Sequence, residues 1–121
     1  MIIDRSKWLY GQKFETSCLY SEMDQRYCCL GFLGMHLGAK TKDFSSSIEL
    51  PSDAKNICEW PNKLFEINKY ELNFFSIPIF WEDELSTIND CISTDNETRE
   101  SWIAAGFKIL FDIDVEFVGK Y

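Results

Sequence analysis

Histidine is the scarcest residue that commonly takes part in catalysis, since the 121 residues contain only His36. Most acid-base and metal schemes would therefore have to use carboxylates. The sequence also lacks G-x-S-x-G, G-x-x-x-x-G-K-[ST], H-E-x-x-H, and H-x-E combined with C-x-x-C. These absences argue against the hydrolases, phosphate-loop proteins, zinc proteases and deaminases that carry those motifs. The sequence predicts a protein that is not an enzyme and needs no cofactor.

Long apolar runs are also missing, because no stretch approaches 18 uncharged apolar residues. Asp4, Arg5 and Lys7 stand where a signal peptide needs its apolar segment. We therefore expect a protein that is not exported and has no membrane partner. Five cysteines, at positions 18, 28, 29, 58 and 91, form no even framework of the kind that secreted domains carry. Reduced, mostly buried thiols in a cytosol are the expected state.

Basic residues are few in the second half of the chain. Residues 1–60 carry seven Lys and Arg against eight Asp and Glu, whereas residues 61–121 carry five against twelve, so the net charge of −8 divides into −1 and −7. Binding to nucleic-acid phosphates or anionic membranes depends on clustered Lys and Arg. The charge therefore argues against direct nucleic-acid binding and favours a basic protein surface as the partner.

Hydrophobic residues make up 45% and aromatic residues 16% of the sequence, which is enough for one core in a single domain over residues 1–121. Residues 14–20 read as a strand, 21–25 as a turn and 26–28 as the start of a returning strand, although the turn lacks Asn-Gly or Asp-Gly. Residues 29–37 predict a short buried helix that ends before Gly38. A surface loop over 39–56 and short elements of undetermined type over 57–85 follow.

The last 28 residues carry the clearest local pattern. Thr94 and Glu97 fit a capping box, and an apolar face predicts a helix over about 95–110. That face consists of Trp102, Ile103, Gly106, Phe107 and Leu110. Residues 112–119 then alternate between acidic and apolar side chains, as in a half-buried strand. An N-terminal hairpin, a buried helix, and a C-terminal helix followed by a strand predict an α+β domain.

The segment "YCCLGFLGMHLG", residues 27–38, raises the question of a catalytic or metal-binding cluster. Cys28 and Cys29 are adjacent, which fits poorly with the paired ligands of a zinc site. Cys29 and His36 share a helical face and would suit a thiol and base pair only with an oxyanion site and a cleft. We interpret the cysteines as core residues and the glycines at 31, 34 and 38 as spacers that allow close approach. A binding pocket is the alternative.

Acidic residues are concentrated in residues 82–100, where only Arg99 opposes them. Three interpretations remain open for this cluster: a solvated face, a divalent cation site without the usual calcium-loop pattern, or an interaction surface. Under the third interpretation the predicted partner-binding residues are Glu82, Asp83, Glu84, Asp90, Asp95, Glu97 and Glu100.

Four short motifs resemble a group of small uncharacterised proteins encoded by bacteriophages and prophages. The matching stretches are Trp8–Gly11, Cys28–Phe32, Ile88–Asp90 and Val115–Val118, which correspond to W-[LI]-x-G, C-C-L-G-F, I-N-D and V-E-F-V. The resemblance spans about half of the chain, and residues 39–80 lie outside it. It implies a phage origin and an accessory role, and it assigns no catalytic residues.

Small accessory phage proteins often counter bacterial immunity, so this analogy leads to three functional hypotheses. In the first, an anti-CRISPR-like inhibitor in the host bacterial cytoplasm binds a basic surface of a host defence protein. In the second, a sponge stacks aromatic side chains on a signalling nucleotide and sequesters it. In the third, the chain is a non-enzymatic regulatory or structural phage protein. The negative charge favours the first hypothesis, and the sequence leaves self-association open.

Overall fold

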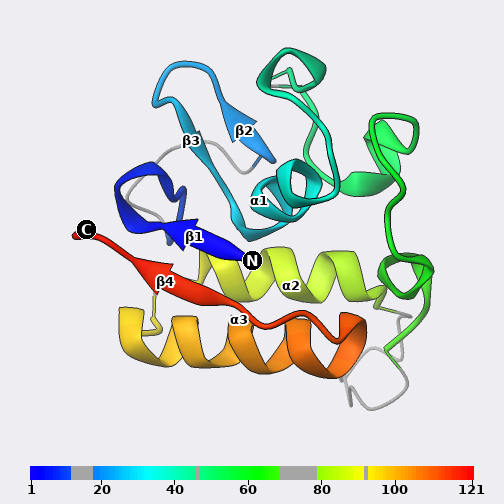
Figure 1. Cartoon of the computed structure of the whole chain (residues 1–121). Helices are drawn as coiled ribbons and strands as arrows, with labels where there is room; N and C mark the ends of the chain where they lie inside the picture. Colours follow the sequence, from blue (N-terminus) through cyan, green and yellow to red (C-terminus); the bar gives the residue numbers. More distant parts are fainter. Residues whose placement is uncertain (12–17, 46, 69–78, 92) are drawn as a thin grey trace.

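Two antiparallel helices, α2 (Trp81–Asp90) and α3 (Asn96–Phe111), form the base of the molecule (Figure 1). The structure is a computed structural model, and it describes residues 1–11, 18–45, 47–68, 79–91 and 93–121. Helix α1 (Cys29–His36) and one small sheet lie above this base, and a second small sheet crosses the view in Figure 1 from above the helices to their level. The predicted α+β class is confirmed.

Helix α1 lies at the centre of the core because its sequence is apolar on nearly every side. Among its residues only His36 is exposed. The helix ends as predicted, with Leu37 as C-cap and Gly38 at a positive φ of 106° that favours glycine. The large apolar side chains that are fully buried come from the N-terminal strand, from all three α-helices and from the connecting segments: Ile3, Trp8, Leu19, Leu30, Leu33, Leu64, Leu85, Ile103 and Phe107.

The first sheet joins the two ends of the chain. Strand β1 (Ile2–Asp4) pairs in parallel with β4 (Glu116–Val118), and Ile3 faces the core from this sheet. Strand β4 is shorter than the strand that the alternating pattern predicts over residues 112–119. Asp112 is in a left-handed conformation as the C-cap of α3, so an extended strand does not begin there. The predicted alternation of burial holds: the acidic positions 112, 114 and 116 are exposed and the apolar positions 113, 115 and 117 are half-buried.

The second sheet is the predicted hairpin, in a shorter form. Strands β2 (Tyr20–Ser21) and β3 (Arg26–Tyr27) are antiparallel, and Ser21 and Asp24 hydrogen-bond each other across the turn. Gln25 takes the positive φ that Asn-Gly or Asp-Gly would otherwise supply. Residues 14–17 of the expected first strand lie outside the described residues.

The middle of the chain departs most from prediction. Short 3-10 helices occur at Thr41–Asp43, Pro51–Ala54 and Asn62–Phe65, in keeping with a loop and short elements. Helix α2, by contrast, is a regular helix that the spacing of apolar residues in the sequence does not predict. Its core-facing side carries the polar residues Glu82 and Asn89 beside Leu85, and this interrupts the apolar spacing by which a helix is recognised. No helix in the described ranges combines the length and apolar character needed to cross a membrane.

Helix α3 matches the predicted span, but its cap differs. Asp95 is the N-cap, and its carboxylate accepts a hydrogen bond of 2.7 Å from the backbone N–H of Thr98. The predicted capping box of Thr94 and Glu97 is therefore wrong, since the helix begins one residue later. The expected apolar face holds for Ile103 and Phe107, whereas Trp102 is 50% exposed and turns away from the core.

Candidate functional site: a buried motif cluster and an exposed acidic helix face

Asn89 is the centre of a buried hydrogen-bond network. Its side-chain oxygen accepts from the indole N–H of Trp8 at 2.9 Å and from the backbone N–H of Cys29 at 3.1 Å. Its amide nitrogen donates to the carbonyl of Leu9 at 2.7 Å, and its own carbonyl accepts from the backbone N–H of Gly11 at 2.8 Å. One fully buried side chain thus links α2 to the N-terminal segment and to the start of α1.

This network brings together the motifs that carry the resemblance. Asn89 belongs to I-N-D, Trp8 to W-[LI]-x-G and Cys29 to C-C-L-G-F, while the ring of Trp8 lies 5.1 Å from that of Phe117 in V-E-F-V. All four residues have roles in holding the core together. The motif residues therefore explain the fold and expose no reactive group in this cluster.

The cysteines of α1 are core residues. Burial raises the pKa of Cys28 to about 12 and that of Cys29 well above its ordinary value, so neither thiol ionises readily. His36 is exposed whereas Cys29 is fully buried, so the two do not form a thiol and base pair. Gly31 and Gly34 act as spacers, as expected, but the space around a Cβ at Gly38 is open.

The seven predicted partner-binding carboxylates do not form one exposed surface. Glu82 is 4% exposed and accepts from the backbone N–H of Ser52 at 3.0 Å, and burial raises its pKa. The Glu100 carboxylate accepts two hydrogen bonds from the Arg5 guanidinium, at 2.8 and 2.9 Å, and the Glu100 side chain is 15% exposed. Both residues stabilise contacts within the fold and offer little charge to a partner.

The other five carboxylates lie nearer to solvent. Asp95 and Glu97 are exposed at the start of α3, although Asp95 also serves as the cap. Asp83, Glu84 and Asp90 are half-buried on α2. In the described part of the chain no three His, Cys, Asp or Glu side chains are placed to hold a metal ion.

Arg99, the one basic residue within the sequence of residues 82–100, lies inside the fold. Its side chain is 2% exposed and its guanidinium donates to the side chain of Asn96 at 2.5 Å, to the carbonyl of Thr94 at 2.8 Å and to the carbonyl of Cys91. The guanidinium thereby fixes the connection between α2 and α3. Neither Arg99 nor the carboxylates of Glu82 and Glu100 therefore contribute much charge to the adjacent surface.

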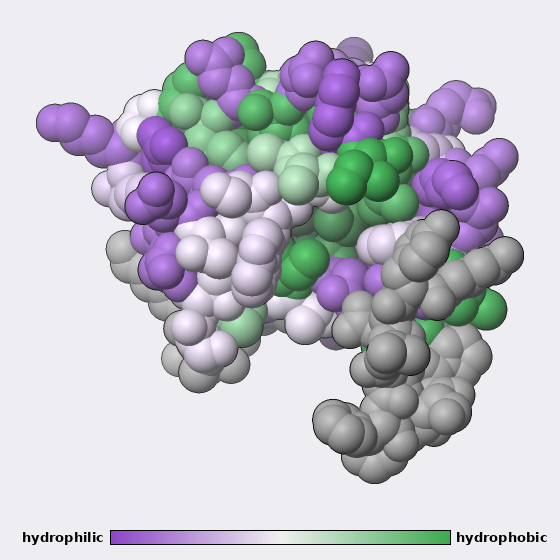
Figure 2. Space-filling model, turned by 90° about the horizontal axis from the view of Figure 1, so that it is seen from below, coloured by the Kyte–Doolittle hydropathy of each residue, from purple (hydrophilic) through white to green (hydrophobic). Residues whose placement is uncertain are grey.

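The outer face of α3 combines apolar and acidic side chains. Trp102 and Ile109 are 50% and 81% exposed, and with the exposed Ala105 they form an apolar stripe at helical spacing. Glu97, Ser101 and Lys108 form the polar stripe beside it. From below, the molecule shows pale and apolar residues next to hydrophilic ones (Figure 2).

Three exposed carboxylates outside the predicted set follow this helix along the chain: Asp112, Asp114 and Glu116. The alternating pattern of residues 112–119 predicts that these three side chains face solvent, and this is the sequence signal for their exposure. Lys108 pairs with Asp112 at 2.9 Å and with Asp114 at 3.2 Å, so its charge is already satisfied. We define the α3 face as Trp102, Ala105 and Ile109 with the exposed carboxylates Asp95, Glu97, Asp112, Asp114 and Glu116.

Comparisons with family models, curated proteins and solved structures gave no match.

Proposed function

We propose that this protein is a phage-encoded accessory factor that inhibits a bacterial defence effector by binding a basic surface of that effector through the α3 face. The observation that carries the proposal is the exposed Trp102 and Ile109 beside five exposed carboxylates. Exposed tryptophan is typical of binding hot spots, and complementary charge directs association. The phage origin and the role against host defence rest on the resemblance of the four motifs.

The partner that suits this face has basic side chains around an apolar contact. Five carboxylates on α3 and the following segment are accompanied there by Lys108, which is paired, and Lys120. A second copy of the chain would bring like charges together, so the proposal favours a different protein. Such an inhibitor would cover the nucleic-acid channel of a nuclease by mimicking the charge of its substrate.

The test replaces Glu97, Asp114 and Glu116 by Lys, because these exposed side chains do not cap the helix. The matched control replaces Glu22, Glu49 and Glu66 by Lys, which changes the net charge equally on exposed positions away from the α3 face. Each protein is used to capture partners from host cells. The captured partner is purified, and its affinity is measured at low and physiological salt.

We expect the wild type and the control to bind a basic effector and to restore phage growth on a defended host. The α3 variant should lose both properties, and a separate Trp102→Ala variant should weaken binding without altering the salt dependence. Equal binding by the α3 variant and the wild type would reject the face. Capture of a regulatory or virion protein instead of a defence effector would reject the anti-defence role.

A further inference from the structure

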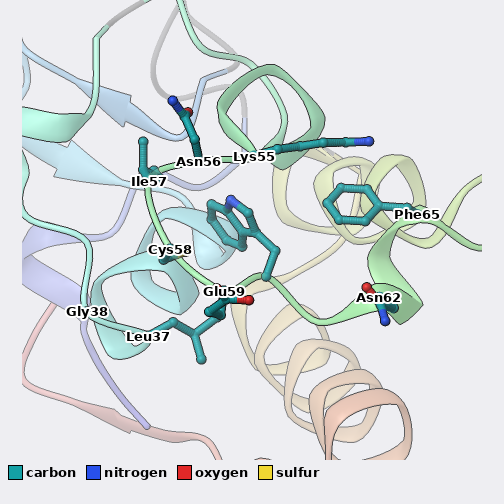
Figure 3. A pocket seen from close by; sticks show the side chains of 10 residues that line it. Leu37, Gly38, Lys55, Asn56, Ile57, Cys58, Glu59, Asn62 and Phe65 are labelled. Carbon is teal, nitrogen blue, oxygen red and sulfur yellow. The ribbon is translucent and has the colours of Figure 1, made fainter.

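A pocket of about 520 Å³ lies between the C-terminal end of α1 and residues 55–65 (Figure 3). Its volume falls within the range of about 300–1,000 Å³ that is typical of small-molecule sites. The pocket is separate from the α3 face, because none of the residues that line it belongs to α3. Its lining residues are Leu37, Gly38, Lys55, Asn56, Ile57, Cys58, Glu59, Trp60, Asn62 and Phe65.

One wall of the pocket is held in place by contacts to the core. Trp60 is 7% exposed, and its indole N–H donates to the carbonyl of Ala54 at 2.9 Å. A Cβ at Gly34 would lie 2.8 Å from the ring of Trp60, so the indole packs tightly against α1. The wall is therefore formed before any ligand binds, which reduces the entropy lost on binding.

The opposite side carries an aromatic ring with a cation next to it. The ammonium of Lys55 lies 4.8 Å from the centroid of the half-buried Phe65 ring. Within the described ranges the salt bridges of lysines involve Lys63 and Lys108, so the charge of Lys55 faces the ring rather than a carboxylate. In Figure 3 the two side chains lie side by side, and Asn62 lies below Phe65, on the side away from Lys55.

These groups define the chemistry of a ligand. A flat ring can stack on the face of Phe65 that the Lys55 ammonium does not cover, and a single anionic group can pair with that ammonium. Side-chain amides can both donate and accept at the edge of a heterocycle. Among the described residues that line the pocket, Lys55 is the one cation and Glu59 the one carboxylate, which suits a ligand with one phosphate better than a polyanion. We propose that this pocket is a binding site for a nucleoside monophosphate, with the base on Phe65 and the phosphate at Lys55.

The site is independent of the proposed inhibitor function, because it needs neither the α3 face nor a protein partner. It gives the nucleotide sponge, the second of the three functional hypotheses, a specific location. Lys55 supplies the cation that such a ligand requires, in a part of the chain that is less acidic than the second half.

The experiment follows backbone amide shifts of the whole isotope-labelled protein during titration with AMP and, separately, with adenosine. The variants are Lys55→Gln, which removes the cation, and Phe65→Leu, which removes the stacking ring and keeps an apolar side chain. Lys63→Gln is the matched control, because it removes an equal charge from an exposed lysine that pairs with Glu66 and does not line the pocket. Unchanged spectra away from the pocket show that each variant is folded.

We expect AMP to shift the amides of residues 37–38, 55–60 and 62 and to bind more tightly than adenosine. Lys55→Gln should weaken AMP binding by about tenfold, as loss of one ion pair does, and leave adenosine binding unchanged. Phe65→Leu should weaken both ligands, and Lys63→Gln should weaken neither. The proposal is overturned if AMP at about 10 mM leaves these amides unshifted, or if Lys55→Gln and Lys63→Gln behave alike.

Discussion

Single polar side chains inside the core determine much of how this protein is held together. Asn89 and Arg99 are 0% and 2% exposed. Asn89 is hydrogen-bonded to groups of distant segments, whereas Arg99 donates through its two terminal nitrogens to nearby residues and its buried Nε has no hydrogen-bond partner among the described residues. Burying such groups is unfavourable unless they are hydrogen-bonded, so each one fixes the position of its partners. When such a side chain is removed by mutation, the loss in free energy of unfolding depends on which buried groups are left without a hydrogen-bond partner.

Asn89→Ala should lower the free energy of unfolding by about 2 to 4 kcal/mol, because the Trp8 indole N–H and the Leu9 carbonyl would lose a buried partner. Urea denaturation followed by circular dichroism measures the change. Thr87→Ala, on the exposed side of α2, is the control and should stay within about 0.5 kcal/mol of the wild type. Equal stability of the two variants would contradict the role assigned to Asn89.

Cys91 should be the most reactive thiol in the folded protein. Hydrogen bonds with the hydroxyls of Ser93 and Thr94, both 3.3 Å long, lower the pKa of Cys91 to about 7, whereas burial raises that of Cys58 to about 11. Alkylation by iodoacetamide should be at least about tenfold faster at Cys91 than at any other cysteine, because the thiolate is the nucleophile.

Peptide mass spectrometry locates the modified cysteine, and the rate should rise through pH 7 as the thiol loses its proton. Ser93→Ala should move this midpoint to higher pH. Faster labelling of Cys28 or Cys58 under native conditions would show that the hydroxyl contacts do not control reactivity.

At the scale of elements, α1 and α3 depend on small residues at their closest contacts. A Cβ at Gly31 would stand 2.1 Å from the backbone carbonyl oxygen of Leu19, a contact that cannot relax without moving the hairpin. At Gly106 the nearest atom is the end of the Leu85 side chain, at 3.2 Å, which can adjust. Identical substitutions should therefore differ in effect according to the neighbouring atom.

Gly31→Ala should destabilise the fold by about 3 kcal/mol, at the upper end of the usual range for overpacking. Gly106→Ala should change the stability by no more than about 1 kcal/mol, because the gain in helix propensity offsets a small adjustment of Leu85. Thermal and urea unfolding of both variants provide the comparison. A neutral Gly31→Ala variant would mean that α1 and the hairpin lie farther apart than the structure places them.

The cap of α3 gives a prediction with a pH dependence. The hydrogen bond from the Thr98 backbone N–H holds the pKa of Asp95 below its ordinary value of 3.8. A lowered pKa in the folded state means that the stabilisation is present above pH 3.8 and is lost as pH falls through the folded-state pKa. Asp95→Ala should thus lower the Tm at pH 7, and its difference from wild type should shrink as the pH is lowered below 3.8.

Thr94→Ala separates the two possible caps. Its hydroxyl donates to the Cys91 sulfur, so its loss should lower the Tm less than Asp95→Ala does. The opposite order would restore the capping box that the sequence pattern predicts.

At the scale of the whole molecule, the fold closes by joining its two ends. The N-terminal ammonium donates to the carbonyl of Asp114 at 2.6 Å, and Arg5 donates both to Glu100 and to the carbonyl of Gly119 at 2.9 Å. These contacts lie beside the parallel pairing of β1 and β4. Residues 114–119 therefore complete the environment of residues 1–5.

The Arg5 and Glu100 pair should contribute about 1 kcal/mol of coupling, since it is paired through two hydrogen bonds and its side chains are only 25% and 15% exposed. A double-mutant cycle with Arg5→Gln and Glu100→Gln measures this energy. The more exposed Lys63 and Glu66 pair is the control and should give less than about 0.5 kcal/mol. Coupling as small as that of the control would show that the pair does not hold the N-terminal segment on α3.

Local patterns in the sequence were sufficient for α1, for the span of α3 and for the existence of a hairpin. Each depends on neighbours within a few residues: an apolar run that ends at Gly38, apolar positions such as Ile103 and Phe107 at helical spacing, and a polar turn between apolar segments. The acidic balance of the second half is likewise a property of composition, and the structure changes only which carboxylates face solvent.

Only the tertiary structure decided the roles of the polar residues. Whether Glu82 is a surface charge or a buried acceptor depends on Ser52, thirty residues earlier, and the role of Asn89 depends on Trp8, eighty-one residues earlier. The exposure of Trp102 similarly depends on which side of α3 meets α2. Such pairings arise from packing between distant segments, and a single sequence carries no local signal for them.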